Sequence, residues 1–163
     1  MKRFVFLEGV PRSGVTSIWR ALQSWHRDEF SYFDHGPWGR YARGGSRRDD
    51  VEVRSALQLA SRAAPVSVAV FVHRDAGAIL RGDQAPGVTL TAEELAEHER
   101  LLGEAFAQVP PAHLLHVWNR EGTTLDDLVA DLQQRLAEIA GQPPSREKLI
   151  AALNALRAGR LTT

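Results

Sequence analysis

The chain contains no cysteine, which excludes disulfide bonds, thiol catalysis and zinc sites built from cysteine. Lysine is nearly as scarce, because only Lys2 and Lys148 are lysines among the 20 basic residues. These are balanced by 20 acidic residues, so the net charge of zero indicates neither a nucleic-acid partner nor a membrane surface. No apolar run approaches the length of a membrane span, and the apolar start lacks the context of a secretory signal. We therefore expect a cytoplasmic protein without a membrane partner.

The length and composition of the chain predict a globular fold. A chain of 163 residues with 44% hydrophobic content suffices for one domain with a buried core. We see no internal repeat, no low-complexity tract and no domain boundary. The sequence therefore predicts a single domain over residues 1–163, in which 144–159 form a C-terminal helical extension.

Strand and helix patterns alternate along the chain. Apolar runs at 3–9, 30–34, 66–73 and 113–119 indicate strands, and that at 66–73 is apolar enough for burial on both faces. Helical patterns occupy 15–25, 51–64, 91–109 and 125–139, with a shorter one after residue 75. The alternation predicts an α/β fold of three layers, a parallel sheet of four or five strands flanked by helices. Residues 4–8 and 66–72 are expected to be its central strands.

The stretch "FLEGVPRSGVTS", residues 6–17, is the most specific motif. Gly9, Gly14 and Thr16 have the spacing of the phosphate-binding signature G-x-x-x-x-G-K-[ST], but Val15 stands where the signature has lysine. This signature needs a strand, a glycine loop and a helix in that order. The glycines permit close approach of the backbone to a phosphate, and the helix N-terminus attracts anions. We expect an anion site here. The alternative is an ordinary glycine turn.

This motif resembles the first loop of thymidylate kinase-like and deoxynucleotide kinase-like P-loop proteins, which reads like "EGxDGSGKST". "EGVPRSGVTS" matches it at Glu8, Gly9, Ser13, Gly14 and the two hydroxyl positions. The resemblance implies a P-loop NTPase-like fold that binds ATP or another nucleoside triphosphate with Mg²⁺, with Thr16 on the metal side. The candidate cofactor-binding residues of the loop are Gly9, Arg12, Ser13, Gly14, Val15, Thr16 and Ser17, and Arg74 is added by the second resemblance given below.

Two further segments resemble parts of the same kinases. "FDHGPW" is similar to the loop that begins their acceptor site, and "VFVHRDAGAILRGDQ" is similar to their strand, helix and arginine-bearing lid. The candidate catalytic residues are Arg12 and Arg81, whose charge would replace the missing lysine in part, and Asp34 and His35, which follow a strand end and would supply a general base. Simpler interpretations are a solvated surface charge for each arginine and a structural histidine in a Gly-Pro loop. The lysine and the "DR" dipeptide of the family are both absent.

A second resemblance competes with the first. "GVPRSGVTS" is also similar to the "GxPRSGTT" loop of sulfotransferases, which use a variant loop without lysine. It implies that Arg12 contacts a phosphosulfate donor without a metal and that Arg74, in "VFVHRD", contacts its second phosphate. The serine of that segment is replaced by Gly82, and the chain is shorter than most sulfotransferases.

Three functions therefore stay open at this point. They are a kinase-like phosphotransferase acting on a nucleotide or other hydroxyl acceptor, a sulfotransferase-like enzyme, and a degenerate P-loop protein that binds without catalysis. Phosphoryl transfer depends on positioned positive charge, so the missing lysine weakens the case for catalysis more than the case for binding. The expected partner is a nucleotide or other small phosphorylated molecule; a homodimer is possible, and nucleic acid is not indicated.

Overall fold

The computed structural model describes residues 3–36, 38–39, 42, 67–82, 90–107 and 109–141. They form a four-stranded, fully parallel sheet with the order β2-β1-β3-β4. Its strands are β1 (Arg3–Gly9), β2 (Phe30–Phe33), β3 (Ser67–Arg74) and β4 (Leu114–Asn119). The expected α/β class, parallel sheet and central strands are confirmed, because β1 and β3 occupy the two middle positions.

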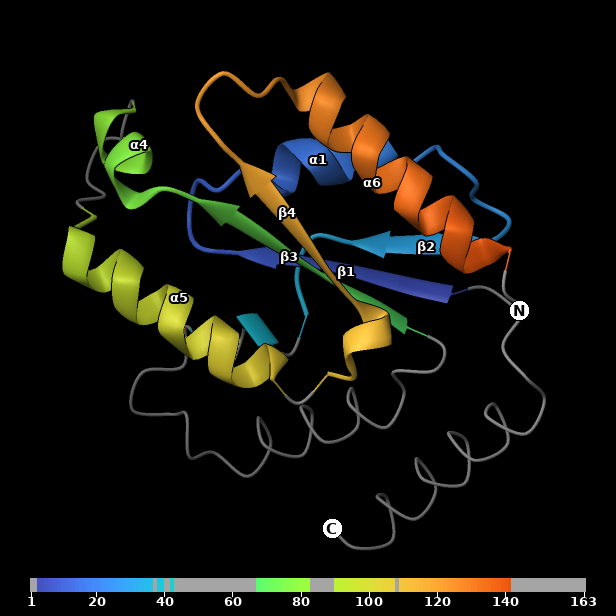
Figure 1. Ribbon diagram of the computed structural model, residues 1–163, viewed down its shortest axis with the longest axis horizontal. Helices are drawn as coiled ribbons and strands as arrows, with labels where there is room; N and C mark the ends of the chain where they lie inside the picture. Colours follow the sequence, from blue (N-terminus) through green and yellow to red (C-terminus); the bar gives the residue numbers. More distant parts are fainter. Residues whose placement is uncertain are drawn as a thin grey trace, which may run out of the picture.

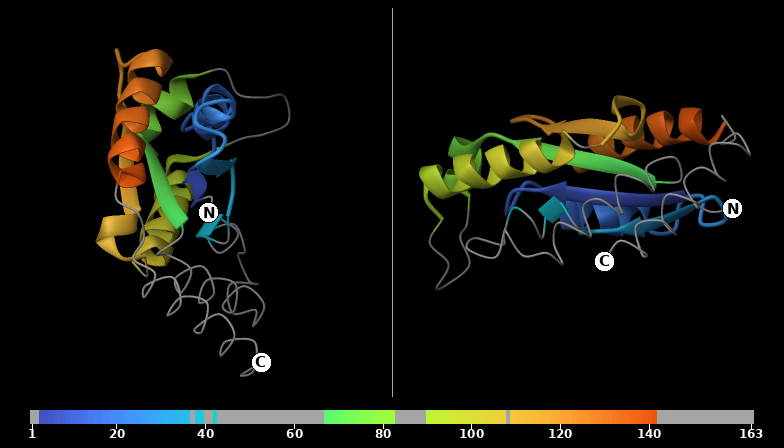
Figure 2. Two further views of the ribbon diagram at one scale, coloured as in Figure 1. Left: turned by 90° about the vertical axis from the view of Figure 1, so that its right-hand side faces the viewer. Right: turned by 90° about the horizontal axis from the view of Figure 1, so that it is seen from below.

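Helices cover both faces of the sheet (Figure 1). One face packs against α1 (Val15–Leu22) and α6 (Leu125–Ala140), which contact each other, and α6 also runs alongside β4 (Figure 2). The opposite face packs against α5 (Ala92–Phe106), preceded by the short α4 (Ala76–Arg81). A 3-10 turn, η3 (Pro111–His113), leads into β4. The helices expected at 51–64 and 144–159 lie outside the described residues.

Strand alternation divides the core between the two faces. The residues of β1 and β3 that face α1 and α6 are Val5, Leu7, Val68, Val70 and Val72. Ala69 and Phe71 face the other way, where Leu102 and Phe106 of α5 cover them. Since full burial of a Val, Leu or Phe side chain contributes about 1.5–3 kcal/mol, these two clusters hold the layers together. Burial on both faces explains the nearly continuous apolar sequence of β3.

The helix starts follow the chemistry of their N-cap residues. Thr91 begins α5 with a capping box to Glu94, as the "TAEE" spacing predicts, and Thr124 begins α6 with a capping box to Asp127. Asp75 caps α4 by accepting a hydrogen bond from the Ala78 amide. By contrast, α1 begins at Gly14, which has no side chain to cap it.

The strand order places a topological switch between β1 and β3. The chain leaves β1 toward β2 on one side and later returns to add β3 on the other side of β1. In open parallel sheets, the crevice beyond the carboxyl ends of the strands at such a point is where ligands bind. Figure 1 shows the connection from β1 to α1 at this end, beside the start of α4.

Candidate functional site

The site is built around residues Val10–Gly14, called here the phosphate loop, which connect β1 to α1. Gly14 adopts the left-handed conformation, with φ of 108°, and Arg12 does so as well, with φ of 64°. Such angles are uncommon for a residue other than glycine, so Arg12 is held in a strained conformation by its surroundings. A Cβ on Gly9 would meet the buried Ser13 Oγ and lie 2.6 Å from the Val72 carbonyl oxygen. Both glycines of the motif are therefore required by geometry.

Two side chains from neighbouring strands hold this loop by its carbonyl groups. Arg74, the last residue of β3, donates from Nη1 to the Arg12 carbonyl at 2.9 Å. Asn119, the last residue of β4, donates from Nδ2 to the Ser13 carbonyl at 2.8 Å. These hydrogen bonds satisfy the two carbonyl oxygens, whose partial negative charge would otherwise repel an anion near the loop. Arg74 was expected at this site from the sequence, whereas Asn119 was not.

The first turn of α1 has unsatisfied donors. Of α1, α4, α5 and α6, only α1 has no side-chain cap, and its first turn carries no acidic residue. The amides at the start of a helix have no intrahelical acceptor, and the helix dipole adds a partial positive charge at the same place. The exposed hydroxyls of Thr16 and Ser17 lie in this turn. This helix end can therefore accept an anion and present a hydroxyl to a metal ion.

Val15 and Ser13 face the protein interior. The Val15 side chain packs against the core cluster under α1, and the Ser13 hydroxyl is buried with no hydrogen-bond partner among the described residues. Val15 can contribute its backbone amide to an anion site, whereas the Ser13 amide already donates to the Val10 carbonyl at 3.1 Å. The position that the signature reserves for lysine is therefore filled by a side chain that stabilises the core.

Basic side chains gather at a cavity beside the loop. Arg74, Arg81 and Arg120 line a cavity of about 370 Å³ between α4 and the turn after β4. Arg81 is exposed and lies 3.8 Å from a carboxylate oxygen of Glu121, which is also exposed. In the part of the chain that the structure describes, no hydrogen bond or ion pair engages the Arg12 guanidinium. The structure thus brings Arg74 to the loop and places Arg81 in the adjoining cavity.

The Asp34–His35 pair follows β2, one strand away from the phosphate loop. His35 Nδ1 lies 2.8 Å from Asp34 Oδ1, and the histidine ring is mostly exposed. Within the described ranges, no hydrogen bond or ion pair joins this pair to Arg12, and their placement at the same sheet edge follows from the pairing of β2 with β1. The sequence correctly indicated that these residues follow a strand end.

Glu8 is a site residue whose importance the sequence did not reveal. Its side chain is 2% exposed, although it precedes the phosphate loop directly. The carboxylate accepts hydrogen bonds from the amides of Gly36 and Gly39, the second at 2.9 Å. It therefore fixes the segment after Asp34–His35 against the end of β1. A carboxylate inside an apolar strand was the available signal, because such a group is buried only where donors satisfy it.

Comparison of the chain with protein-family models, with curated proteins and with solved structures gives no match. In the described part of the chain, no helix has the length and apolarity to cross a membrane. Nor do His, Asp or Glu side chains gather in groups of three that could hold a metal ion within the ranges described.

Proposed function

We propose that the chain binds the phosphate groups of a nucleotide at the phosphate loop and the first turn of α1. One observation carries this proposal: α1 alone among α1, α4, α5 and α6 starts without a cap, and Arg74 and Asn119 engage the carbonyls of the loop that precedes it. Free amides, a helix dipole and glycines that permit close approach are the features of an anion site. The position at the switch point between β1 and β3 supports the same function.

Magnesium fits this site through Thr16. Its hydroxyl lies in the exposed first turn of α1, on the second residue of the helix. A bound Mg²⁺ would neutralise charge on the phosphates, which is its usual contribution in nucleotide sites. The neutral Thr16 hydroxyl would supply one ligand, and phosphate oxygens and water would supply the others.

Kinase ancestry with weakened transfer is the interpretation of this site that we favour. Val15 packs inward, so the loop provides no compact ammonium group for the transition state. Arg12 is the basic residue on the loop itself, although its planar guanidinium cannot copy the geometry of lysine. The Asp34–His35 pair supplies a base at the edge where an acceptor hydroxyl would bind. These features therefore favour nucleotide binding more strongly than they favour phosphotransfer.

A sulfotransferase-like function is the second candidate, and the cavity beside the loop favours it. A phosphosulfate donor carries a second anionic group, and Arg74, Arg81 and Arg120 line a cavity of about 370 Å³ next to the loop. The hydrogen bond from Arg74 to the Arg12 carbonyl uses only one of its guanidinium nitrogens. Such a donor would bind without magnesium.

Isothermal titration calorimetry distinguishes the candidates. We expect ATP to bind more tightly with Mg²⁺ than without it, and Arg12→Gln to weaken binding about tenfold, which corresponds to one lost charge-assisted hydrogen bond. Arg20→Gln is the matched control, because Arg20 lies in the last turn of the same helix and should leave affinity unchanged. Tighter, metal-independent binding of adenosine 3′,5′-bisphosphate would favour the sulfotransferase-like function. The absence of binding of either ligand at millimolar concentration to the folded protein would refute the proposal.

A further inference from the structure

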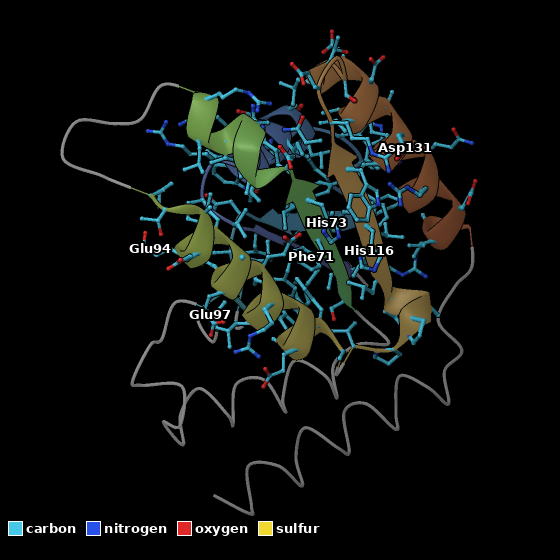
Figure 3. The ribbon with its side chains drawn as sticks, turned by 60° about the vertical axis from the view of Figure 1, so that its left-hand side comes forward. Phe71, His73, Glu94, Glu97, His116 and Asp131 are labelled. Atoms are coloured by element: carbon cyan, nitrogen blue, oxygen red, sulfur yellow. The ribbon has the colours of Figure 1, made fainter. Side chains whose placement is uncertain are left out.

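A chain of three hydrogen-bonding side chains crosses β3 and β4 on the face covered by α5. His73 Nε2 lies 2.8 Å from His116 Nδ1, and His73 Nδ1 lies 3.3 Å from Glu99 Oε1. Figure 3 shows the two histidines next to each other on their neighbouring strands. The phosphate site described above does not use this chain of groups.

In this row of hydrogen-bonded side chains, the Glu99 carboxylate determines which nitrogens donate and which accept. An ionised Glu99 only accepts, so His73 Nδ1 carries the hydrogen and its Nε2 carries a lone pair. His116 Nδ1 must then donate to His73 Nε2, which leaves the lone pair of His116 Nε2 free to take up a proton. A first proton on His116 preserves the bond between the rings. A second proton on His73 breaks it, because both facing nitrogens then carry hydrogens.

Packing fixes His73 while leaving His116 able to move. The His73 ring is 8% exposed and lies between Phe71 and Trp118, with ring centroids 3.9 and 4.0 Å away. Among the described residues, the charged groups around the pair are Glu99 from α5, Arg120 over the Trp118 ring, and three residues of α6. Asp127, Asp131 and Arg135 of this helix line a pocket together with His116, and Arg135 pairs with Asp131 and donates to the His116 carbonyl. Glu99 attracts a protonated His73 and keeps it in place. His116, whose ring is exposed, is therefore the member that moves when both rings are charged.

The histidine pair lies next to the two residues that hold the phosphate loop. His73 precedes Arg74 directly, and it pairs in the sheet with Trp118, which precedes Asn119. Arg74 and Asn119 form the last pair of β3 and β4, and both donate to carbonyls of the loop. The ends of strands open most easily, so side-chain contacts there influence how firmly these two donors are positioned.

We propose that the His73–His116 hydrogen bond braces the carboxyl ends of β3 and β4, positions the phosphate loop through Arg74 and Asn119, and is released when both histidines are protonated. His73 and His116 are positioning residues in this arrangement, since neither touches the loop. The proposal rests on the proposed function in one respect: release of the His73–His116 hydrogen bond can alter affinity only if the loop binds an anion. The result is a phosphate site that weakens in acid.

The direction of the titration of His73 agrees with this arrangement. Burial is the largest influence and lowers the pKa of His73 below 6.5, and the charge of a nearby His116 lowers it further, while Glu99 opposes both. Burial therefore keeps His73 neutral, and the brace intact, at neutral pH. Release needs a proton on His73, whose pKa is lowered, so it occurs only at a pH below the ordinary histidine pKa.

The test measures sulfate affinity as a function of pH, because sulfate does not titrate in this range. Binding is followed by the NMR shifts of the Gly14 and Val15 amides between about pH 7.5 and pH 5, which bracket the ordinary imidazole pKa. We expect the affinity of the wild type to fall about three- to tenfold toward acid, which is the range for loss of one net hydrogen bond. His116→Gln retains a donor that cannot titrate, so it should bind as the wild type does at the upper pH and lose most of the pH dependence.

Two controls separate the brace from other causes. His26→Asn removes an exposed histidine at a positive φ, which asparagine tolerates, and it should keep the pH dependence of the wild type. His116→Ala should bind three- to tenfold more weakly even at the upper pH. Identical pH curves for the wild type and His116→Gln would overturn the brace.

Failure of the proposed function gives a different result. If no sulfate binds at any pH, the anion site is refuted, and the brace is read in the ligand-free protein from the imidazole nitrogens and the Gly14 amide. Shifts of Gly14 that follow the histidine titration in the wild type and vanish in His116→Gln support the brace. A Gly14 signal that does not respond to this titration refutes it.

Discussion

Replacing Gly14 by alanine tests whether the phosphate loop has the geometry that an anion site requires. A left-handed conformation costs an L-residue roughly 1–2 kcal/mol, and Gly14 has φ of 108°. The new Cβ would also lie 3.0 Å from Asn119 Nδ2, so the amide must shift and weaken its hydrogen bond to the Ser13 carbonyl. That bond contributes about 0.5–1.5 kcal/mol net. We therefore expect Gly14→Ala to lower the free energy of unfolding by about 1.5–3.5 kcal/mol.

Gly122 provides the matched control for this strain. It has φ of 83°, and a Cβ added to it would meet nothing within 4 Å. Gly122→Ala should therefore cost only the conformational strain of roughly 1–2 kcal/mol. The difference between the two variants measures the contact with Asn119. Urea denaturation followed by tryptophan fluorescence gives both values, and Gly14→Ala should also weaken the binding of Mg²⁺–ATP.

A double-mutant cycle isolates the contact itself. In an Asn119→Ala background, the Cβ at Gly14 no longer meets an amide, so Gly14→Ala should cost as little as Gly122→Ala does. The cycle should show a coupling of about 0.5–1.5 kcal/mol between Gly14 and Asn119. Equal costs at Gly14 and Gly122 in the wild-type background, with no coupling to Asn119, would show that the loop is not held as described.

Glu8→Leu leaves the buried Gly39 amide and the half-buried Gly36 amide without their acceptor. It should destabilise the fold by about 1–3 kcal/mol for the Gly39 amide and by less for the Gly36 amide, while Glu8→Gln, which still accepts, should cost less in urea denaturation. Because the pKa of His73 is lowered in the folded protein, the unfolded chain binds its proton first, and stability should fall as the pH drops from 6.5 toward the folded-state pKa. Thermal melts show this fall, and its absence would contradict a buried neutral His73. Val15→Lys should tighten Mg²⁺–ATP binding in calorimetry and lower the melting temperature, since it removes a side chain that packs on the core; unchanged affinity would contradict the role assigned to the missing charge.

The sequence predicts the layers of this fold well, because the patterns that specify them are local. The β-branched run of β3 and the apolar stripe of α6 each appear within one window of the chain. Thr91 lies three residues from Glu94 and marks the start of α5 correctly, and Thr124 has the same spacing to Asp127 at the start of α6. The predicted first helix extends to residue 25, but α1 ends at Leu22, since helix ends depend on tertiary packing as well as on propensity.

The candidate site is predicted only in part, because it is assembled from distant segments. The glycine spacing identifies the loop, but Asn119 lies 106 residues from the Ser13 carbonyl that it engages. Only the strand order makes them neighbours, and no local pattern specifies that order. The inward packing of Val15 is likewise invisible in the motif, which assigns that position to a charged side chain. Glu8 is recognised as buried only once the amides of Gly36 and Gly39 are placed beside it.

The missing lysine separates binding from chemistry in this loop. Binding draws on the amides and dipole of α1, which require no charged side chain at Val15. Phosphoryl transfer depends on positive charge that stabilises the moving phosphoryl group in the transition state. Loss of one such charge costs several kcal/mol, and each 1.36 kcal/mol lowers the rate about tenfold. Arg74 cannot fill that role freely, because its guanidinium already holds the Arg12 carbonyl. Arg12 itself is the remaining basic group on the loop, and its strained backbone sets where its charge can lie. A nucleotide affinity that depends on Arg12, together with slow or undetectable transfer, is therefore the combination that this loop favours.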